Sequence, residues 1–112
     1  MKCFNELTGD DKKILFNNAE VLDFAEKVKF KTATTNTYTY FNVSAEYQIR
    51  ITKNKRTGGS KGYYLTIHEQ NEDGIGYKTE YMNNILVIGT LKEAKITAGE
   101  IYWYLIRNEY LN

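Results

Sequence analysis

Residues 41–51 alternate strictly between apolar and polar side chains, and this pattern constrains the fold more than any other in the chain. The apolar positions are Phe41, Val43, Ala45, Tyr47, Ile49 and Ile51, and the polar ones are Asn42, Ser44, Glu46, Gln48 and Arg50. Successive side chains of a β-strand point to opposite faces, so the alternation predicts one strand over 41–51 with a buried and a solvated face. Tyr38 and Tyr40 share the polar parity, which predicts two aromatic rings at the start of the solvated face.

Two more strands are indicated further along the chain. Alternation over residues 63–68 predicts the second strand. Residues 71–74 read Asn-Glu-Asp-Gly, a hairpin signal because Asp-Gly tolerates positive φ. The third strand contains residues 77–81, and the apolar run 85–88 either extends it or forms a fourth strand. The short connections predict an antiparallel meander.

A helix is predicted before the strands. Thr8, followed by two aspartates, is a suitable N-cap, and apolar residues recur at helical spacing to residue 28. Asn17 and Asn18 interrupt this stripe, so two shorter helices are an alternative. Residues 27–33 are either a ragged last turn of the helix or a short strand that follows it.

A second helix is predicted after the strands. Thr90 and Glu93 form a capping-box pattern, and the apolar stripe that follows continues through Leu105. Gly99 lies within this stripe, which predicts a close approach to the sheet or a restart of the helix at residues 97–100. Together these elements predict a single α+β domain over residues 1–112, with a C-terminal helix packed on one face of a three- or four-stranded sheet.

The charges are strongly segregated along the chain. The formal net charge is +1, but residues 1–26 carry −3, residues 27–61 carry +7 and residues 62–112 carry −3. This block pattern indicates either a binding surface or solvated strands whose lysines discourage edge pairing. Lysine, asparagine, isoleucine and tyrosine have AT-rich codons, so an AT-rich bacterium, phage or mobile element is the expected source.

Residues 53–64 read KNKRTGGSKGYY, and their glycines and cations invite comparison with a phosphate-binding loop. The P-loop requires Gly-Lys-Ser/Thr at the start of a helix, whereas here Lys61 is followed by Gly62 and a predicted strand. We therefore predict a basic hairpin tip that joins two strands, with Lys53, Lys55, Arg56 and Lys61 as contact residues.

Catalytic chemistry is not indicated. His68 is the single histidine, and we interpret it as a surface residue because it lies on the solvated parity of the second strand. Cys3 and Ser44 lack the context of a nucleophile. Residues that ligate metals do not occur at the required spacings. We predict no catalytic residue, no metal and no cofactor.

Two local resemblances bear on nucleic-acid binding. Residues 61–63, Lys-Gly-Tyr, match the first three positions of the ribonucleoprotein motif, and residues 64–67 depart from it. The helix–three strands–helix order resembles the double-stranded-RNA-binding domain, whose phosphate-binding helix start, Lys-Lys-x-Ala-Lys, resembles residues 92–95. Leu91 replaces the first lysine, and that family's Gly-Pro-x-His loop is absent. We interpret both resemblances as convergent and assign no family.

The predicted contact surface combines the basic hairpin with the polar sheet face. Its residues are Arg50, Lys53, Lys55, Arg56, Lys61, Tyr38, Tyr40 and Tyr64. Trp103, in a Tyr-Trp-Tyr run, is a candidate anchor for a partner or an oligomer, unless it packs on the first helix.

The function expected from these features is non-catalytic binding. The first expectation is a small phage- or mobile-element-type inhibitor of a host nucleic-acid-targeting enzyme, similar to anti-CRISPR proteins. The alternatives are a direct nucleic-acid-binding module and a homo-oligomeric interaction domain. A lone cysteine, Cys3, and the absence of a signal-peptide pattern or a long apolar run predict a cytoplasmic chain without membrane contact. The expected partner is a larger protein, and nucleic acid is a possible ligand.

Overall fold

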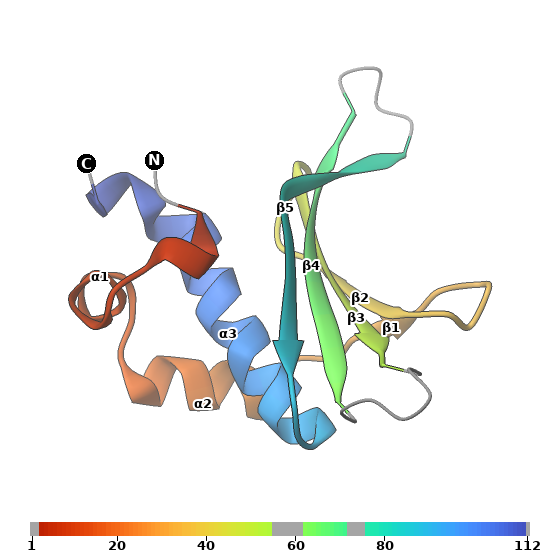
Figure 1. Ribbon diagram of the computed structural model, residues 1–112, viewed down its shortest axis with the longest axis horizontal. Helices are drawn as coiled ribbons and strands as arrows, with labels where there is room; N and C mark the ends of the chain where they lie inside the picture. The colour runs from red at the N-terminus through yellow and green to blue at the C-terminus, as the bar shows by residue number, and fades with distance from the viewer. Residues whose placement is uncertain (1–2, 55–61, 72–75, 112) are drawn as a thin grey trace.

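The chain forms a five-stranded antiparallel sheet with its helices on one side (Figure 1). The elements in chain order are η1 Phe4–Glu6, α1 Gly9–Leu15, α2 Asn18–Lys27, β1 Lys31–Thr32, β2 Thr39–Asn42, β3 Tyr47–Lys53, β4 Tyr63–Gln70, β5 Tyr77–Val87, α3 Leu91–Arg107 and η2 Asn108–Leu111. The computed structural model describes residues 3–54, 62–71 and 76–111, with the backbone alone over 77–84. Strand order follows chain order, which confirms the predicted α+β meander, although the sheet has five strands rather than three or four.

The N-terminal helical pattern is divided into two helices, as the asparagine pair allowed. Thr8 caps α1, where its side chain accepts a hydrogen bond from the Asp11 backbone N–H at 3.1 Å. Asn17 caps α2 in the same way, since its side chain accepts from the Glu20 N–H at 2.8 Å. A residue that interrupts the apolar stripe is thus the start signal of the next helix.

The prediction of one continuous strand over 41–51 is wrong. Residues 43–46 form a loop that joins β2 to β3, and the Ser44 hydroxyl accepts from the Glu46 and Tyr47 N–H groups at 3.1 and 3.3 Å. Phe41 pairs with Ile49 across the resulting hairpin. Asn42 pairs with Gln48, so five residues separate these last paired positions. Because this number is odd, partners on the two strands have the same sequence parity, and the alternation continues through the turn.

The two ambiguous segments are both strands. Helix α2 ends at Lys27 and the short strand β1 follows. Residues 85–87 of the apolar run at 85–88 are the last residues of β5 and do not form a separate strand. The β4–β5 register shifts along the way, because Leu65 pairs with Ile85 whereas Ile67 pairs with Glu80. Figure 1 shows β5 bending sharply along its length.

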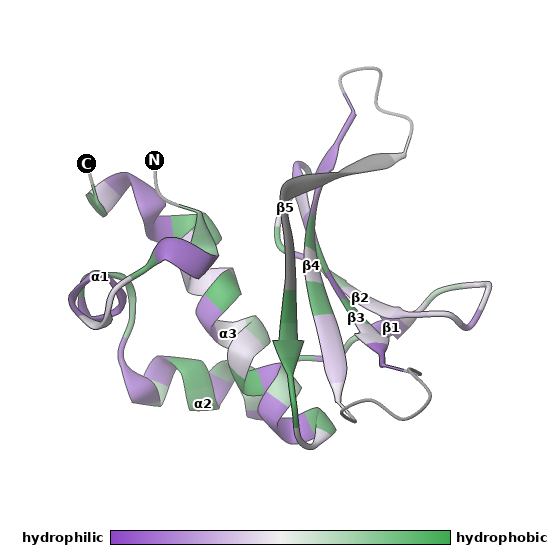
Figure 2. Cartoon of the chain, viewed as in Figure 1, coloured by the Kyte–Doolittle hydropathy of each residue, from purple (hydrophilic) through white to green (hydrophobic). Residues whose placement is uncertain are grey.

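The hydrophobic core lies between α3 and the sheet. Its fully buried members include Leu15, Ile49, Leu65, Ile67, Ala94, Ala98, Ile101 and Tyr104. Hydrophobic residues, green in Figure 2, alternate with paler ones along β4 and concentrate at the end of β5. A β-strand with one face on a core produces this banding.

Helix α3 is continuous over its 17 residues, so the predicted restart near residue 97 does not occur. The expected close approach at Gly99 is present, but its neighbour is α2 rather than the sheet. A Cβ atom on Gly99 would lie 3.1 Å from both the Phe24 Cδ1 atom and the Val21 carbonyl oxygen. Gly99 therefore sets how closely the two helices pack.

Candidate functional site: the open face of the sheet

The side of the sheet that carries no helix is called here the open face (Figure 1). Cross-strand pairing places on it Lys31, Tyr40, Asn42, Gln48, Arg50, Thr52, Tyr64, Thr66 and His68. None of the described residues that pairing assigns to this face is Asp or Glu. Leu86, opposite Tyr64, adds one exposed apolar side chain. The face is otherwise polar and weakly cationic, which suits an anionic or acidic ligand.

Three predicted contact residues meet at one end of this face. The Arg50 guanidinium lies over the Tyr38 ring, 4.4 Å from its centroid. The rings of Tyr38 and Tyr40 are 6.2 Å apart and inclined by 58°. Tyr40 is directly opposite Arg50 in the β2–β3 ladder. The structure thus brings Tyr38, Tyr40 and Arg50 into one cluster, held partly by a cation–π contact.

A buried glutamine fixes the arginine in this cluster. Gln48 is only 5% exposed, and its amide oxygen accepts a 2.6 Å hydrogen bond from Arg50 Nε. Its amide nitrogen donates to the Asn42 side-chain oxygen at 3.0 Å. Gln48 therefore uses both ends of its amide and orients Arg50 and Asn42 at the same time. Sequence analysis placed Gln48 on this face but gave no signal that it would be buried.

A cavity of about 410 Å³ lies beside this cluster, between the sheet and the segment that joins β1 to β2. Its lining residues are Thr32, Ala33, Thr34, Thr35, Tyr38, Tyr40, Asn42, Gln48 and Arg50. The segment folds back through a hydrogen bond from the Ala33 N–H to the Tyr38 carbonyl and through Asn36, whose φ is 56°. The threonines of this wall were not predicted, because only the folded loop brings them to Arg50.

His68 also belongs to the open face, but the prediction that it is a surface residue is wrong. It is 8% exposed, pairs with Gln48 across the β3–β4 ladder, and its Nε2 lies 2.7 Å from the Thr66 hydroxyl. Burial, with a smaller contribution from the Arg50 charge, lowers the pKa of His68 to about 4. The imidazole is neutral at pH 7 and is part of the packed sheet.

The other predicted contact residues do not all join the cluster. Tyr64 lies on the open face, diagonal to Arg50, because Thr66 is the direct partner of Arg50. Lys53 has the opposite parity and lies near Tyr63 and Leu91 at the end of β3, on the helix side of the sheet. The segment that contains Lys55, Arg56 and Lys61 joins β3 to β4 as predicted, and these three residues lie outside the described part of the chain.

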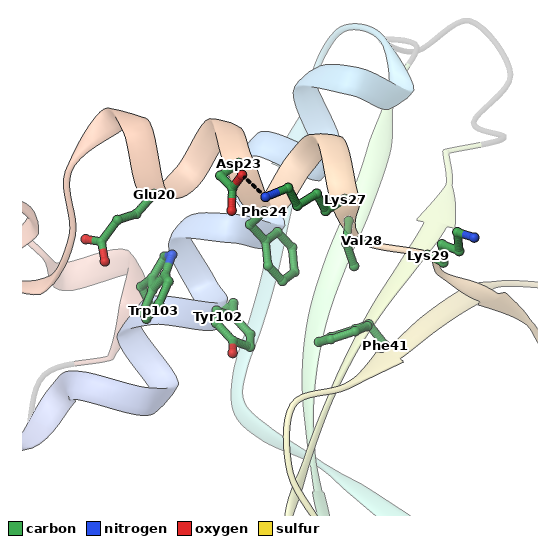
Figure 3. Close-up of a pocket in the computed structure, with 9 residues that line it drawn as sticks. All are labelled: Glu20, Asp23, Phe24, Lys27, Val28, Lys29, Phe41, Tyr102 and Trp103. Atoms are coloured by element: carbon green, nitrogen blue, oxygen red, sulfur yellow. Dashed lines mark ion pairs between the residues drawn. The ribbon is translucent and has the colours of Figure 1, made fainter.

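Trp103 lines a second cavity of about 480 Å³ between α2, α3 and β2 (Figure 3). Its ring is half-buried, and the Arg107 guanidinium lies 4.0 Å from the ring centroid. Arg107 in turn makes two hydrogen bonds to the Glu20 carboxylate, at 2.8 and 3.0 Å, which hold the pKa of Glu20 below its usual value. The indole is therefore packed beneath α2 and Arg107 and does not project freely from α3.

The aromatic residues around Trp103 pack mainly on one another. The Phe24 and Tyr102 rings are 4.8 Å apart, and Phe41 meets Phe24 edge-on at 5.5 Å. Figure 3 shows these rings together below α2, with the Asp23–Lys27 ion pair above them. This cluster fastens α2 and α3 to β2.

Neither a metal site nor a membrane segment is found in the part of the chain that the structure describes. There, no three His, Cys, Asp or Glu side chains gather in a way that would hold a metal ion. None of its helices combines the length and the apolar character that a membrane crossing requires.

No protein-family model matches the chain, and comparison with curated proteins and with solved structures gives no significant match.

Proposed function

We propose that this chain is a non-catalytic binding protein whose open face contacts a larger protein partner. The partner class we propose is a host nucleic-acid-targeting enzyme, inhibited by the chain in the manner of a small phage- or mobile-element-encoded, anti-CRISPR-like protein. This role places the chain in the cytoplasm of its host.

The observation that carries the proposal is the cluster of Tyr38, Tyr40 and Arg50 on a face without acidic residues among those described. Tyrosine and arginine, with tryptophan, are the residues enriched at the energetic centres of protein interfaces. Gln48 holds Arg50 in place before any partner arrives, which reduces the cost of ordering on binding. An acidic patch on the partner would complement this face.

The buried histidine supports the non-catalytic part of the proposal. A general base needs access to its substrate and a pKa near the working pH. His68 is almost completely buried, its Nε2 is hydrogen-bonded to the Thr66 hydroxyl, and its pKa is about 4. These properties suit a structural residue of the sheet.

Direct binding of nucleic acid is the second candidate function. Its specific support is the Tyr38–Tyr40 pair beside Arg50, since aromatic rings and arginine planes stack on unpaired bases. The basic segment that contains Lys55, Arg56 and Lys61 would supply phosphate contacts. Against this candidate, the described open face carries few cations, and the formal net charge of the chain is only +1.

Affinity capture from the source host, followed by an activity assay, tests the first proposal. The tagged full chain is compared with the double variant Tyr40→Ala/Tyr64→Ala, which removes two open-face rings. The matched control is Tyr110→Ala, since Tyr110 is a tyrosine of η2 that is 65% exposed. We expect the wild type and the control to retain a nucleic-acid-targeting enzyme and to inhibit it, and the double variant to lose at least tenfold in affinity.

Equal retention by all three proteins would remove the open face from the interface, and failure to recover or inhibit any such enzyme would refute the inhibitor proposal.

Binding of short single-stranded DNA and RNA at two salt concentrations examines the second candidate. If phosphates are contacted directly, a plot of the logarithm of the binding constant against the logarithm of the salt concentration should have a slope of about −0.7 for each neutralised phosphate. A triple variant, with Lys55, Arg56 and Lys61 each replaced by Glu, shows whether the basic segment contributes to either activity.

A further inference from the structure

We propose that the groove between the end of α2 and the start of α3 is a self-association surface that binds the same groove of a second copy of this chain. The groove has a volume of about 470 Å³ and is lined by Leu22, Ala25, Glu26, Leu91, Lys92 and Lys95. Trp103, the oligomer anchor that the sequence suggested, lines the other cavity between α2 and α3 and is not among these residues. This inference goes beyond the proposed function and does not depend on it, because the helices lie on the side of the sheet opposite the open face (Figure 1).

The middle of the groove is apolar and exposed. Leu22 is 49% exposed and Leu91 is 42% exposed, although each belongs to a helix whose other face packs on the core. Ala25, three residues after Leu22 on α2, has a side chain too small to fill the space between the helices. Apolar side chains that are exposed next to one another mark contact surfaces, and in a two-fold interface each of them contributes twice.

The charges on the two walls of the groove have opposite signs. Glu26 stands on the α2 wall, whereas Lys92 and Lys95 stand on the α3 wall. None of these three side chains forms an ion pair with another described residue. A two-fold rotation that joins two grooves places α2 of one copy against α3 of the other, so Glu26 of each copy faces the two lysines of the other. The groove is therefore complementary to itself.

This arrangement of charge favours a second copy over a foreign partner with a surface of one sign. An acidic surface would complement the two lysines but would meet Glu26 with like charge, and a basic surface would have the reverse mismatch. A second copy satisfies both walls at once. Exposed ion pairs contribute little free energy, so we expect the leucines to supply most of the affinity and the charges to determine the orientation.

Sedimentation velocity of the full chain over a series of concentrations tests the proposal. We expect the wild type to show a concentration-dependent equilibrium between monomer and dimer. Leu22→Ser should raise the dissociation constant of the dimer at least tenfold, because it removes an apolar side chain near the two-fold axis. Ile14→Ser is the matched control and should leave the constant unchanged, since Ile14 is 57% exposed on α1 and does not line the groove.

Exchange of the charges shows whether the two walls face each other. Glu26→Lys alone, and Lys92→Glu with Lys95→Glu, should each dissociate the dimer because each places like charges across the interface. An equimolar mixture of these two proteins should form dimers again, with one chain of each kind, which native mass spectrometry identifies. A single chain with all three substitutions should dimerise by itself.

The substitutions should leave the helices intact. Glu26 is in the last turn of α2 and Lys92 in the first turn of α3, so the new charges suit the helix dipoles. Circular dichroism spectra of the variants verify the fold. Glu109→Lys, at an exposed position of η2, is the charge control and should not change the dimer.

The inference is overturned if the wild type stays monomeric at the highest concentration at which it is soluble, or if Leu22→Ser dimerises as tightly as the wild type. It is also overturned if the mixture of the two charge variants stays monomeric, or if Ile14→Ser or Glu109→Lys dissociates the dimer, since the interface would then lie elsewhere. No other protein is present in these measurements, so their failure is distinguishable from failure of the capture experiment.

Discussion

At the scale of single residues, His68 gives the sheet a pH dependence that an exposed histidine would not. Burial keeps the imidazole neutral in the folded state, where its pKa is about 4, against the usual value of 6.5. Between these two pH values the unfolded chain binds a proton that the folded chain does not. The unfolding free energy should therefore fall as the pH drops from 6.5 toward 4, by about 1.4 kcal/mol for each pH unit.

Chemical denaturation at a series of pH values measures this slope. The control is His68→Gln, which keeps a polar side chain beside Thr66 but cannot titrate. Glu20, whose pKa lies below its usual value of 4.5, destabilises the fold in the same direction only at lower pH, so the interval from 6.5 to 5 isolates the histidine. If the wild type and His68→Gln have the same slope there, the imidazole is not buried as described.

At the scale of elements, the packing of α2 on α3 depends on a glycine. Gly99→Ala would place a methyl group 3.1 Å from the Val21 carbonyl oxygen and from the Phe24 ring, so the helices would have to separate by a few tenths of an ångström. An alanine in a helix interior otherwise gains about 1 kcal/mol over glycine. We expect the clash to exceed this gain and to lower the melting temperature by several degrees.

Gly9→Ala is the matched control, because nothing lies within 4 Å of a Cβ atom at this helical glycine. Thermal denaturation should therefore show a melting temperature equal to or above that of the wild type for Gly9→Ala, and a lower one for Gly99→Ala. A rise in melting temperature for Gly99→Ala would show that α2 and α3 have room to adjust.

The elements that were predicted correctly are those that local sequence determines. Thr8 and Thr90 cap their helices through hydrogen bonds to residues three positions away, so the signal is complete within one turn. The hairpin at residues 43–46 was missed for the opposite reason. The odd number of residues between the paired positions Asn42 and Gln48 leaves the alternation unbroken. No Gly or Asn-Gly pair marks the loop, in which the Ser44 hydroxyl accepts hydrogen bonds from the backbone.

The candidate site was predictable only in part. Tyr38, Tyr40 and Arg50 share a parity, so their common face followed from the sequence. Their meeting with Thr34 and Thr35 requires the β1–β2 segment to fold over the sheet, which depends on tertiary structure. The burial of Gln48 likewise depends on its neighbours on the open face, and a periodic pattern of polar residues does not report it.

At the scale of the whole molecule, the two sides of the sheet differ in what covers them. The helices and their aromatic fastening around Phe24 and Tyr102 occupy one side. The other side retains an ordered polar network in which Gln48 supports Arg50 and Asn42. Under the proposed function this division separates stability from recognition, so open-face tyrosines should be replaceable without loss of the fold.

Hydroxyl-radical footprinting of the full chain, alone and with its captured partner, tests most directly the claim that the open face is the contact surface. Oxidation rates of individual tyrosines are read by mass spectrometry. We predict slower oxidation of Tyr38, Tyr40 and Tyr64 in the complex and an unchanged rate for Tyr110, which lies in η2. Protection of Tyr110 or Trp103, with the three open-face tyrosines unaffected, would contradict the claim and place the interface on the helices.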